Sequence, residues 1–136
     1  MILADLSHLD VMKKQFNLSA NMTKLEKETL EKAIIVLQEN EWTKEFSARN
    51  KSGYEVPADS PQACSFCAYG AILKASPDVV VSVSLLNNLC KFIDDTVTIP
   101  TAQFWVTPLF AFNDAAESKE EVIQLFRDFL MYEENS

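Results

Sequence analysis

Three cysteines and one histidine are the residues of this sequence whose types could carry nucleophilic, redox or zinc chemistry. Cys64 and Cys67 form a Cys-x-x-Cys motif, with Cys90 further along and His8 near the N-terminus. An exposed thiol at a helix start is activated by the helix dipole, and four such ligands could hold zinc. The sequence contains no second Cys-x-x-Cys and no histidine pair, and the motif's neighbours are apolar. We therefore interpret the cysteines as structural, with a reactive thiol or a zinc site as alternatives, and predict no cofactor and no metal.

Asn113 and Asp114 are a second polar group, placed shortly before the last predicted helix. We interpret them as turn residues whose side chains bond the local backbone, and the alternative is a polar pair that lines a pocket. The sequence contains only two glycines, Gly53 and Gly70, and therefore no glycine-rich phosphate-binding loop. Enzymes that bind ATP, GTP or dinucleotides in the familiar ways are not expected.

The net charge of −8 lies almost entirely in the second part of the chain. Residues 1–57 carry 9 acidic and 8 basic side chains, whereas residues 58–136 carry 11 and 4. An acidic surface repels nucleic acids and anionic membranes and attracts basic proteins. We predict a protein partner with a basic surface, no direct nucleic acid and no membrane. The expected contact residues are Asp94, Asp95, Glu117, Glu121 and Trp105.

The N-terminus lacks the features of a signal peptide, because Asp5 and Asp10 interrupt its apolar residues. No apolar run approaches the roughly 20 residues that span a bilayer. Three cysteines, an odd number, are typical of reduced thiols rather than of a disulfide framework. We expect a cytoplasmic protein.

Helical periodicity and helix caps predict most of the elements that must position these residues. Thr23 with Glu26, and Ser118 with Glu121, are capping boxes that open two amphipathic helices. Ser60-Pro61 predicts the start of a helix that runs to Ala75. Gly70 in this helix lowers helix stability by about 1 kcal/mol relative to alanine. Its presence therefore indicates close backbone packing or a nearby ligand. The remaining expectations are a helix over 2–16, a β-hairpin at 46–56, a helix over 82–93 and irregular structure over 96–112.

These elements predict a mainly α fold, a compact bundle of about five helices to which the 46–56 hairpin would be a small addition. We expect residues 1–22 to be an N-terminal helical extension and residues 23–136 to be a single globular helical domain.

Several short motifs, taken in order, resemble those of a known family. They are Glu41-Trp42-Thr43-Lys44, Ser52-Gly53-Tyr54-Glu55-Val56, the run from Ala63 to Ala71, and Phe112-Asn113-Asp114 followed by Ser118 to Val122. The chain resembles, over about residues 24–131, a family of small bacterial and phage proteins known as domain of unknown function 6197. It departs from the family pattern at Glu41, at Phe112 and in residues 1–22.

The resemblance implies that six residues form one structural or functional constellation: Trp42, Cys67, Gly70, Ala71, Asn113 and Asp114. It implies no catalytic residue, because the family has no established activity. Because the chain is small, acidic and poor in cysteine and shows no catalytic groups, we expect a non-enzymatic protein-binding module, encoded by a phage or mobile element, that inhibits a host defence system. An anti-CRISPR protein that covers the basic surface of a nucleic-acid-binding complex is one example.

Two other functions remain as alternatives. The first is a small ligand-binding domain or thiol enzyme with a pocket near Cys67, Asn113 and Asp114. The second is a homo-oligomeric structural protein, with residues 2–16 forming the dimer contact.

Overall fold

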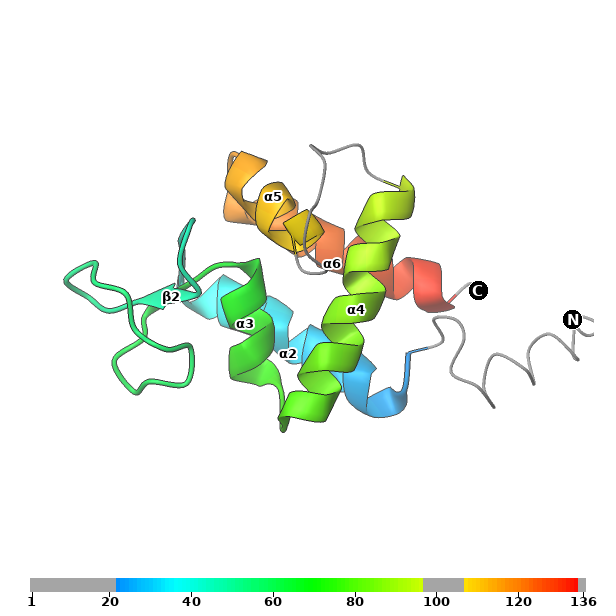
Figure 1. Ribbon diagram of the computed structural model, residues 1–136, viewed down its shortest axis with the longest axis horizontal. Helices are drawn as coiled ribbons and strands as arrows, with labels where there is room; N and C mark the ends of the chain where they lie inside the picture. Colours follow the sequence, from blue (N-terminus) through cyan, green and yellow to red (C-terminus); the bar gives the residue numbers. More distant parts are fainter. Residues whose placement is uncertain (1–21, 97–106, 135–136) are drawn as a thin grey trace, which may run out of the picture.

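The computed structural model describes residues 22–96 and 107–134, which form five helices and a small three-stranded sheet (Figure 1). The mainly α class is therefore confirmed. The predictions for His8, for the 2–16 helix and its dimer contact, and for Trp105 lie outside the described residues. In chain order the elements are α2 (Lys24–Glu39), β1 (Glu41–Trp42), β2 (Ala48–Arg49), β3 (Ser65–Phe66), α3 (Ala68–Ala75), α4 (Val79–Thr96), α5 (Thr107–Ala115) and α6 (Lys119–Glu134).

Helix α2 begins at the predicted capping box. The Thr23 hydroxyl accepts a hydrogen bond from the backbone N–H of Glu26, and the Glu26 carboxylate accepts one from the N–H of Thr23. Leu30, Ala33 and Leu37 then point into the core with no exposed surface. Because both free amides at the helix start are satisfied locally, this helix could be predicted from its own residues.

The core lies where α2 meets α3, α4 and α6. Figure 1 shows α3 and α4 side by side across α2, with α5 beside the far end of α4. Phe126 and Phe129 of α6 are fully buried, and the Phe129 ring lies 5.2 Å from that of Phe92 on α4. No helix within the described ranges is long and apolar enough to cross a membrane.

The sheet joins three two-residue strands in the order β1-β3-β2. Strand β1 runs parallel to β3, with Trp42 opposite Phe66, and β2 runs antiparallel to β3, with Ala48 opposite Phe66. The expected turn at 46–56 is present, because Arg49 forms a bridge with Glu55. Gly53 in this turn has a φ of +89°, which favours glycine.

Two local sequence predictions are wrong. The helix expected from Ser60-Pro61 begins only at Ala68, because Ser65 and Phe66 are extended and pair with both other strands. The second error is at 107–112, which was expected to be irregular and instead belongs to α5. In addition, α4 begins at Val79 rather than near Ser82, since the Asp78 carboxylate caps it by accepting from the N–H of Val81.

Candidate functional site

Asn113, on the last turns of α5, joins three segments that are distant in sequence. Its Oδ1 accepts hydrogen bonds from Trp42 Nε1 at 2.8 Å and from the backbone N–H of Ala68 at 2.9 Å. Its Nδ2 donates to the backbone carbonyl of Thr43 at 3.1 Å. The side chain is only 1% exposed, so these bonds replace its contacts with water. The amide of Asn113 therefore holds β1 and the start of α3 against α5.

Asp114 is exposed and holds the loop after β1. Its Oδ1 accepts from the backbone N–H of Glu45 at 3.2 Å and from Asn113 Nδ2 at 3.3 Å. Glu45 has a φ of +77°, a left-handed conformation that costs a non-glycine residue roughly 1–2 kcal/mol. The interpretation of Asn113 and Asp114 as residues bonded mainly to local backbone is therefore wrong, because their side chains reach residues about 45 to 70 positions away.

Gly70 explains why α3 can approach the loop before β2. A Cβ built at Gly70 would overlap the carbonyl oxygen of Ser47 and lie 2.7 Å from its carbonyl carbon. The same carbonyl accepts a hydrogen bond from the N–H of Cys67 at 3.1 Å. The close approach that Gly70 indicates is thus between two backbones. With these contacts, Trp42, Cys67, Gly70, Asn113 and Asp114 form one connected cluster.

The thiols of Cys67 and Cys90 are buried and not activated. Cys67 is the N-cap of α3, and its Sγ accepts from the N–H of Gly70 at 3.3 Å. Burial raises the pKa of the Cys67 thiol above its ordinary value, although the hydrogen bond from Gly70 opposes this change. Burial also raises the pKa of Cys90 to about 11. Cys64 is half-buried. In the described ranges no three Cys, His, Asp or Glu residues lie close enough to hold a metal ion, so the three cysteines do not share a zinc site.

We expect alkylation of the native protein by iodoacetamide near neutral pH to be fastest at Cys64. The thiolate is the reacting species, and a pKa of about 11 leaves roughly a hundredfold less thiolate at Cys90 than at an ordinary thiol. Tandem mass spectrometry at timed intervals measures the three rates, and the urea-unfolded chain is the control in which they should converge. Alkylation of native Cys67 as fast as Cys64 would contradict this assignment.

A cavity of about 250 Å³ adjoins this cluster. We call it the Asp114 cavity, and its lining residues are Glu45, Phe46, Ser47, Glu55, Cys67, Phe110, Asn113 and Asp114. A larger groove of about 720 Å³ shares Ser47 and Glu55 with it and continues between the 55–59 loop, α3 and the start of α4. Trp42 and Gly70 hold this region together but do not line the cavity.

Sequence reasoning missed five residues that line the cavity, namely Glu45, Phe46, Ser47, Glu55 and Phe110. Two signals could have identified some of them. A hairpin around Gly53 brings the residues before it against Glu55, and Phe110 precedes Asn113 and Asp114 by about one helical turn.

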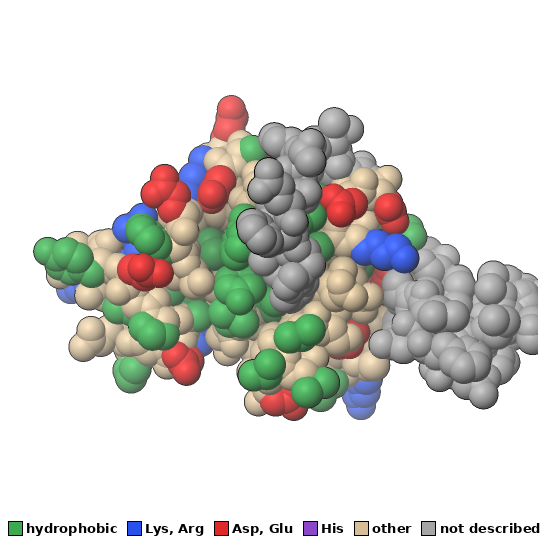
Figure 2. All heavy atoms as spheres, in the orientation of Figure 1, with side chains coloured by type: hydrophobic (Ala, Val, Ile, Leu, Met, Phe, Trp, Pro, Cys, Tyr) green, Lys and Arg blue, Asp and Glu red, His purple; other side chains and the backbone are tan. Residues whose placement is uncertain are grey.

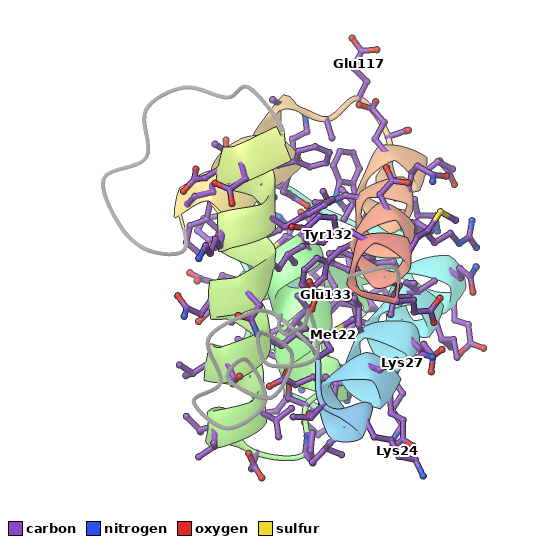
Figure 3. All side chains as sticks on the ribbon, turned by 90° about the vertical axis from the view of Figure 1, so that its right-hand side faces the viewer. Met22, Lys24, Lys27, Glu117, Tyr132 and Glu133 are labelled. Carbon is purple, nitrogen blue, oxygen red and sulfur yellow. The ribbon has the colours of Figure 1, made fainter. Side chains whose placement is uncertain are left out.

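The four acidic residues predicted to contact a partner are Asp94 and Asp95 on α4, Glu117 in the connection between α5 and α6, and Glu121 on α6. Asp94 and Asp95 are exposed near the end of α4, which lies at the upper right of Figure 1, whereas α6 begins toward the upper left. Glu117 projects from the top of the molecule in Figure 3. Glu121 has a structural role, because its carboxylate accepts from the N–H of Glu117 at 2.8 Å. Figure 2 shows acidic side chains scattered among other types on the visible face.

Comparison with known proteins connects this chain to one family. Residues 22–129 match a family of unknown function, DUF6197, which confirms the resemblance found in the motifs. No curated protein and no solved structure matches the chain.

Proposed function

The chain belongs to the DUF6197 family of unknown function, and we propose that it is a non-enzymatic protein-binding module that recognises a basic surface. The observation that supports this proposal is the excess of acidic over basic side chains, 20 against 12. Across residues 22–96 and 107–134, Lys27 with Glu134 is the one ion pair, with 2.8 Å between Nζ and Oε2. A protein surface with unpaired carboxylates attracts and orients a basic partner.

The polar cluster around Asn113 supports a non-enzymatic role. Both polar atoms of the Asn113 amide are engaged with Trp42, Ala68 and Thr43. Cys67 is buried, and its raised pKa disfavours the thiolate that a nucleophile needs. These groups hold segments of the fold together and leave no activated nucleophile within the cluster.

The more specific form of the proposal is an inhibitor of a host defence system, encoded by a phage or mobile element and acting in the host cytoplasm. An acidic domain of this size can compete with nucleic acid for the lysines and arginines of a nucleic-acid-binding complex, as an anti-CRISPR protein would. In this form the module binds the protein and makes no direct contact with nucleic acid.

An affinity capture with charge-reversed variants tests the proposal. The tagged chain is incubated with host lysate at moderate salt, and captured proteins are identified by mass spectrometry. We expect one stoichiometric partner with a basic surface, whose capture declines as salt rises. The absence of any partner would contradict the proposed function.

Reversal of Asp94, Asp95, Glu117 and Glu121 to lysine should weaken binding to that partner by at least about tenfold at moderate salt. The matched control reverses four exposed acids elsewhere on α2 and α6, which changes the net charge equally. These residues are Glu28, Glu31, Glu39 and Asp128. The assignment of the contact to these four residues would be wrong in either of two cases: if their reversal left binding undiminished, or if the control variant lost as much affinity.

The Asp114 cavity favours a second candidate function, a small ligand-binding domain with its pocket beside Cys67, Asn113 and Asp114. Its thiol-enzyme version requires an accessible, activated Cys67. The alkylation rates described above distinguish that version from a structural cysteine.

A further inference from the structure

We propose that the Asp114 cavity binds the guanidinium group of an arginine side chain presented by a protein partner. This inference rests on the proposed function, because it specifies where a basic partner would contact the module. It adds a contact in the cavity between α3, α5 and the loops around β2 to the contacts expected near the end of α4 and the start of α6.

The size of the cavity suits one long side chain. A volume of about 250 Å³ is the space that roughly eight water molecules occupy in the liquid. It lies below the range of roughly 300–1,000 Å³ that is usual for pockets of drug-sized ligands. One arginine side chain therefore fits the cavity better than a nucleotide or a larger cofactor.

The charged groups that line the cavity are all acidic. Glu45, Glu55 and Asp114 contribute carboxylates, and no lysine, arginine or histidine is among the lining residues. None of the three forms an ion pair with a cation of the described ranges. Asp114 uses Oδ1 for its hydrogen bonds with Glu45 and Asn113, so Oδ2 is available to a donor. A guanidinium group would supply the missing positive charge and several N–H donors at once.

The aromatic walls favour a guanidinium over a compact ammonium or a metal ion. Phe46 and Phe110 line the cavity, and the ring of Phe46 already lies 4.4 Å from the guanidinium carbon of Arg49. Arg49 forms no ion pair with these carboxylates, and its N–H groups donate to Thr43, Gly53 and Lys44 instead. Arginine stacks on aromatic rings and bridges carboxylates with its planar fork.

The adjoining groove explains why the guanidinium would belong to a protein. It continues from Ser47 and Glu55 past Asp59 and Asp78, and its other lining residues include Tyr69, Leu73 and Val79. No basic side chain lines this groove either. A segment of the partner chain could therefore lie along the groove and place its arginine in the Asp114 cavity.

Amide NMR of the full chain tests the site with two small probes of the same shape. The probes are N-acetyl-arginine N-methylamide and N-acetyl-citrulline N-methylamide, which differ in the charge of the head group. We expect the arginine probe to shift the amide signals of Glu45, Glu55 and Asp114 in a saturable way, and the citrulline probe to leave them unchanged. Equal shifts with both probes, or shifts confined to other regions, would overturn the proposal.

Single substitutions locate the interaction. Asp114→Asn keeps an oxygen that can accept from the N–H of Glu45, and Glu55→Gln keeps the shape of its side chain. Each should weaken binding of the arginine probe by at least about fivefold. Glu39→Gln is the control, since Glu39 is exposed and lines neither cavity. If both cavity variants bound the arginine probe with unchanged affinity, the assignment of the binding site to this cavity would be wrong.

A peptide distinguishes a protein partner from a small cation. The peptide Gly-Gly-Arg-Gly-Gly should bind more tightly than the arginine probe if a partner chain occupies the groove, and no gain would overturn the protein part of the proposal. Failure of all arginine probes would leave the affinity capture unaffected, because that experiment reports any basic partner. The two proposals therefore fail separately.

Discussion

Replacement of Gly70 by alanine should destabilise the protein by about 3 kcal/mol or more. Within a helix, replacing glycine by alanine normally stabilises the protein by about 1 kcal/mol. The destabilisation expected here is therefore opposite in sign to the effect of helix propensity. The reason is the backbone of Ser47, whose carbonyl group occupies the position of the added Cβ. To relieve the overlap, α3 must move away from the loop before β2, which also weakens the bond between Cys67 and Ser47.

Urea unfolding monitored by circular dichroism measures this change. Gly53→Ala is the matched control, because Gly53 has open space around it and the cost comes only from its positive φ. That variant should lose roughly 1–2 kcal/mol. A Gly70→Ala protein as stable as the unmodified chain would show that the contact with Ser47 does not constrain α3.

The second large effect is expected at Asn113. Asn113→Ala should lower the free energy of unfolding by about 3–5 kcal/mol, since it leaves one buried and two half-buried groups without their partner. These groups are Trp42 Nε1, the N–H of Ala68 and the carbonyl of Thr43. Each unsatisfied buried group costs roughly 1–3 kcal/mol, and partial access of water reduces the sum.

Two further variants separate the contributions at this position. Trp42→Phe removes one donor and retains most of the ring, so it should cost only about 1 kcal/mol beyond the change in packing. Asn113→Asp retains an acceptor for Trp42 and Ala68 but loses the donor to Thr43 and adds a charge next to Asp114. Its stability should lie between those of the unmodified chain and Asn113→Ala. Urea unfolding measures all three, and similar losses for Trp42→Phe and Asn113→Ala would contradict the connecting role of Asn113.

The elements that could be predicted were those that local contacts specify. The capping box of Thr23 and Glu26 satisfies amides within one helical turn, and the apolar residues that follow it repeat with helical spacing. Helix α6 likewise begins within one residue of the predicted Ser118 start, although Glu121 bonds Glu117 rather than closing the expected box. Such interactions involve residues a few positions apart and do not depend on the rest of the fold.

The elements that could not be predicted depend on contacts between distant segments. Ser65 and Phe66 are extended because they pair with residues of β1 and β2 that lie 16 to 24 positions earlier. This pairing overrides the helix-start signal of Ser60-Pro61. Local propensity cannot reveal which segments will meet across a sheet. For this reason α3 begins at Ala68, with Cys67 as its N-cap, rather than near Pro61.

The mainly α class, the capping box of α2, the start of α6 and, through the order of the motifs, the family could all be read from the sequence. It also identified Trp42, Cys67, Gly70, Asn113 and Asp114 as a group. Only the tertiary structure decided what the group does, because the hydrogen bonds of Asn113 and the contact of Gly70 with Ser47 join backbones that approach each other only after the helices pack. The Asp114 cavity has the same origin, since its acidic and aromatic walls come from two loops and from α5, which only the packed core brings together.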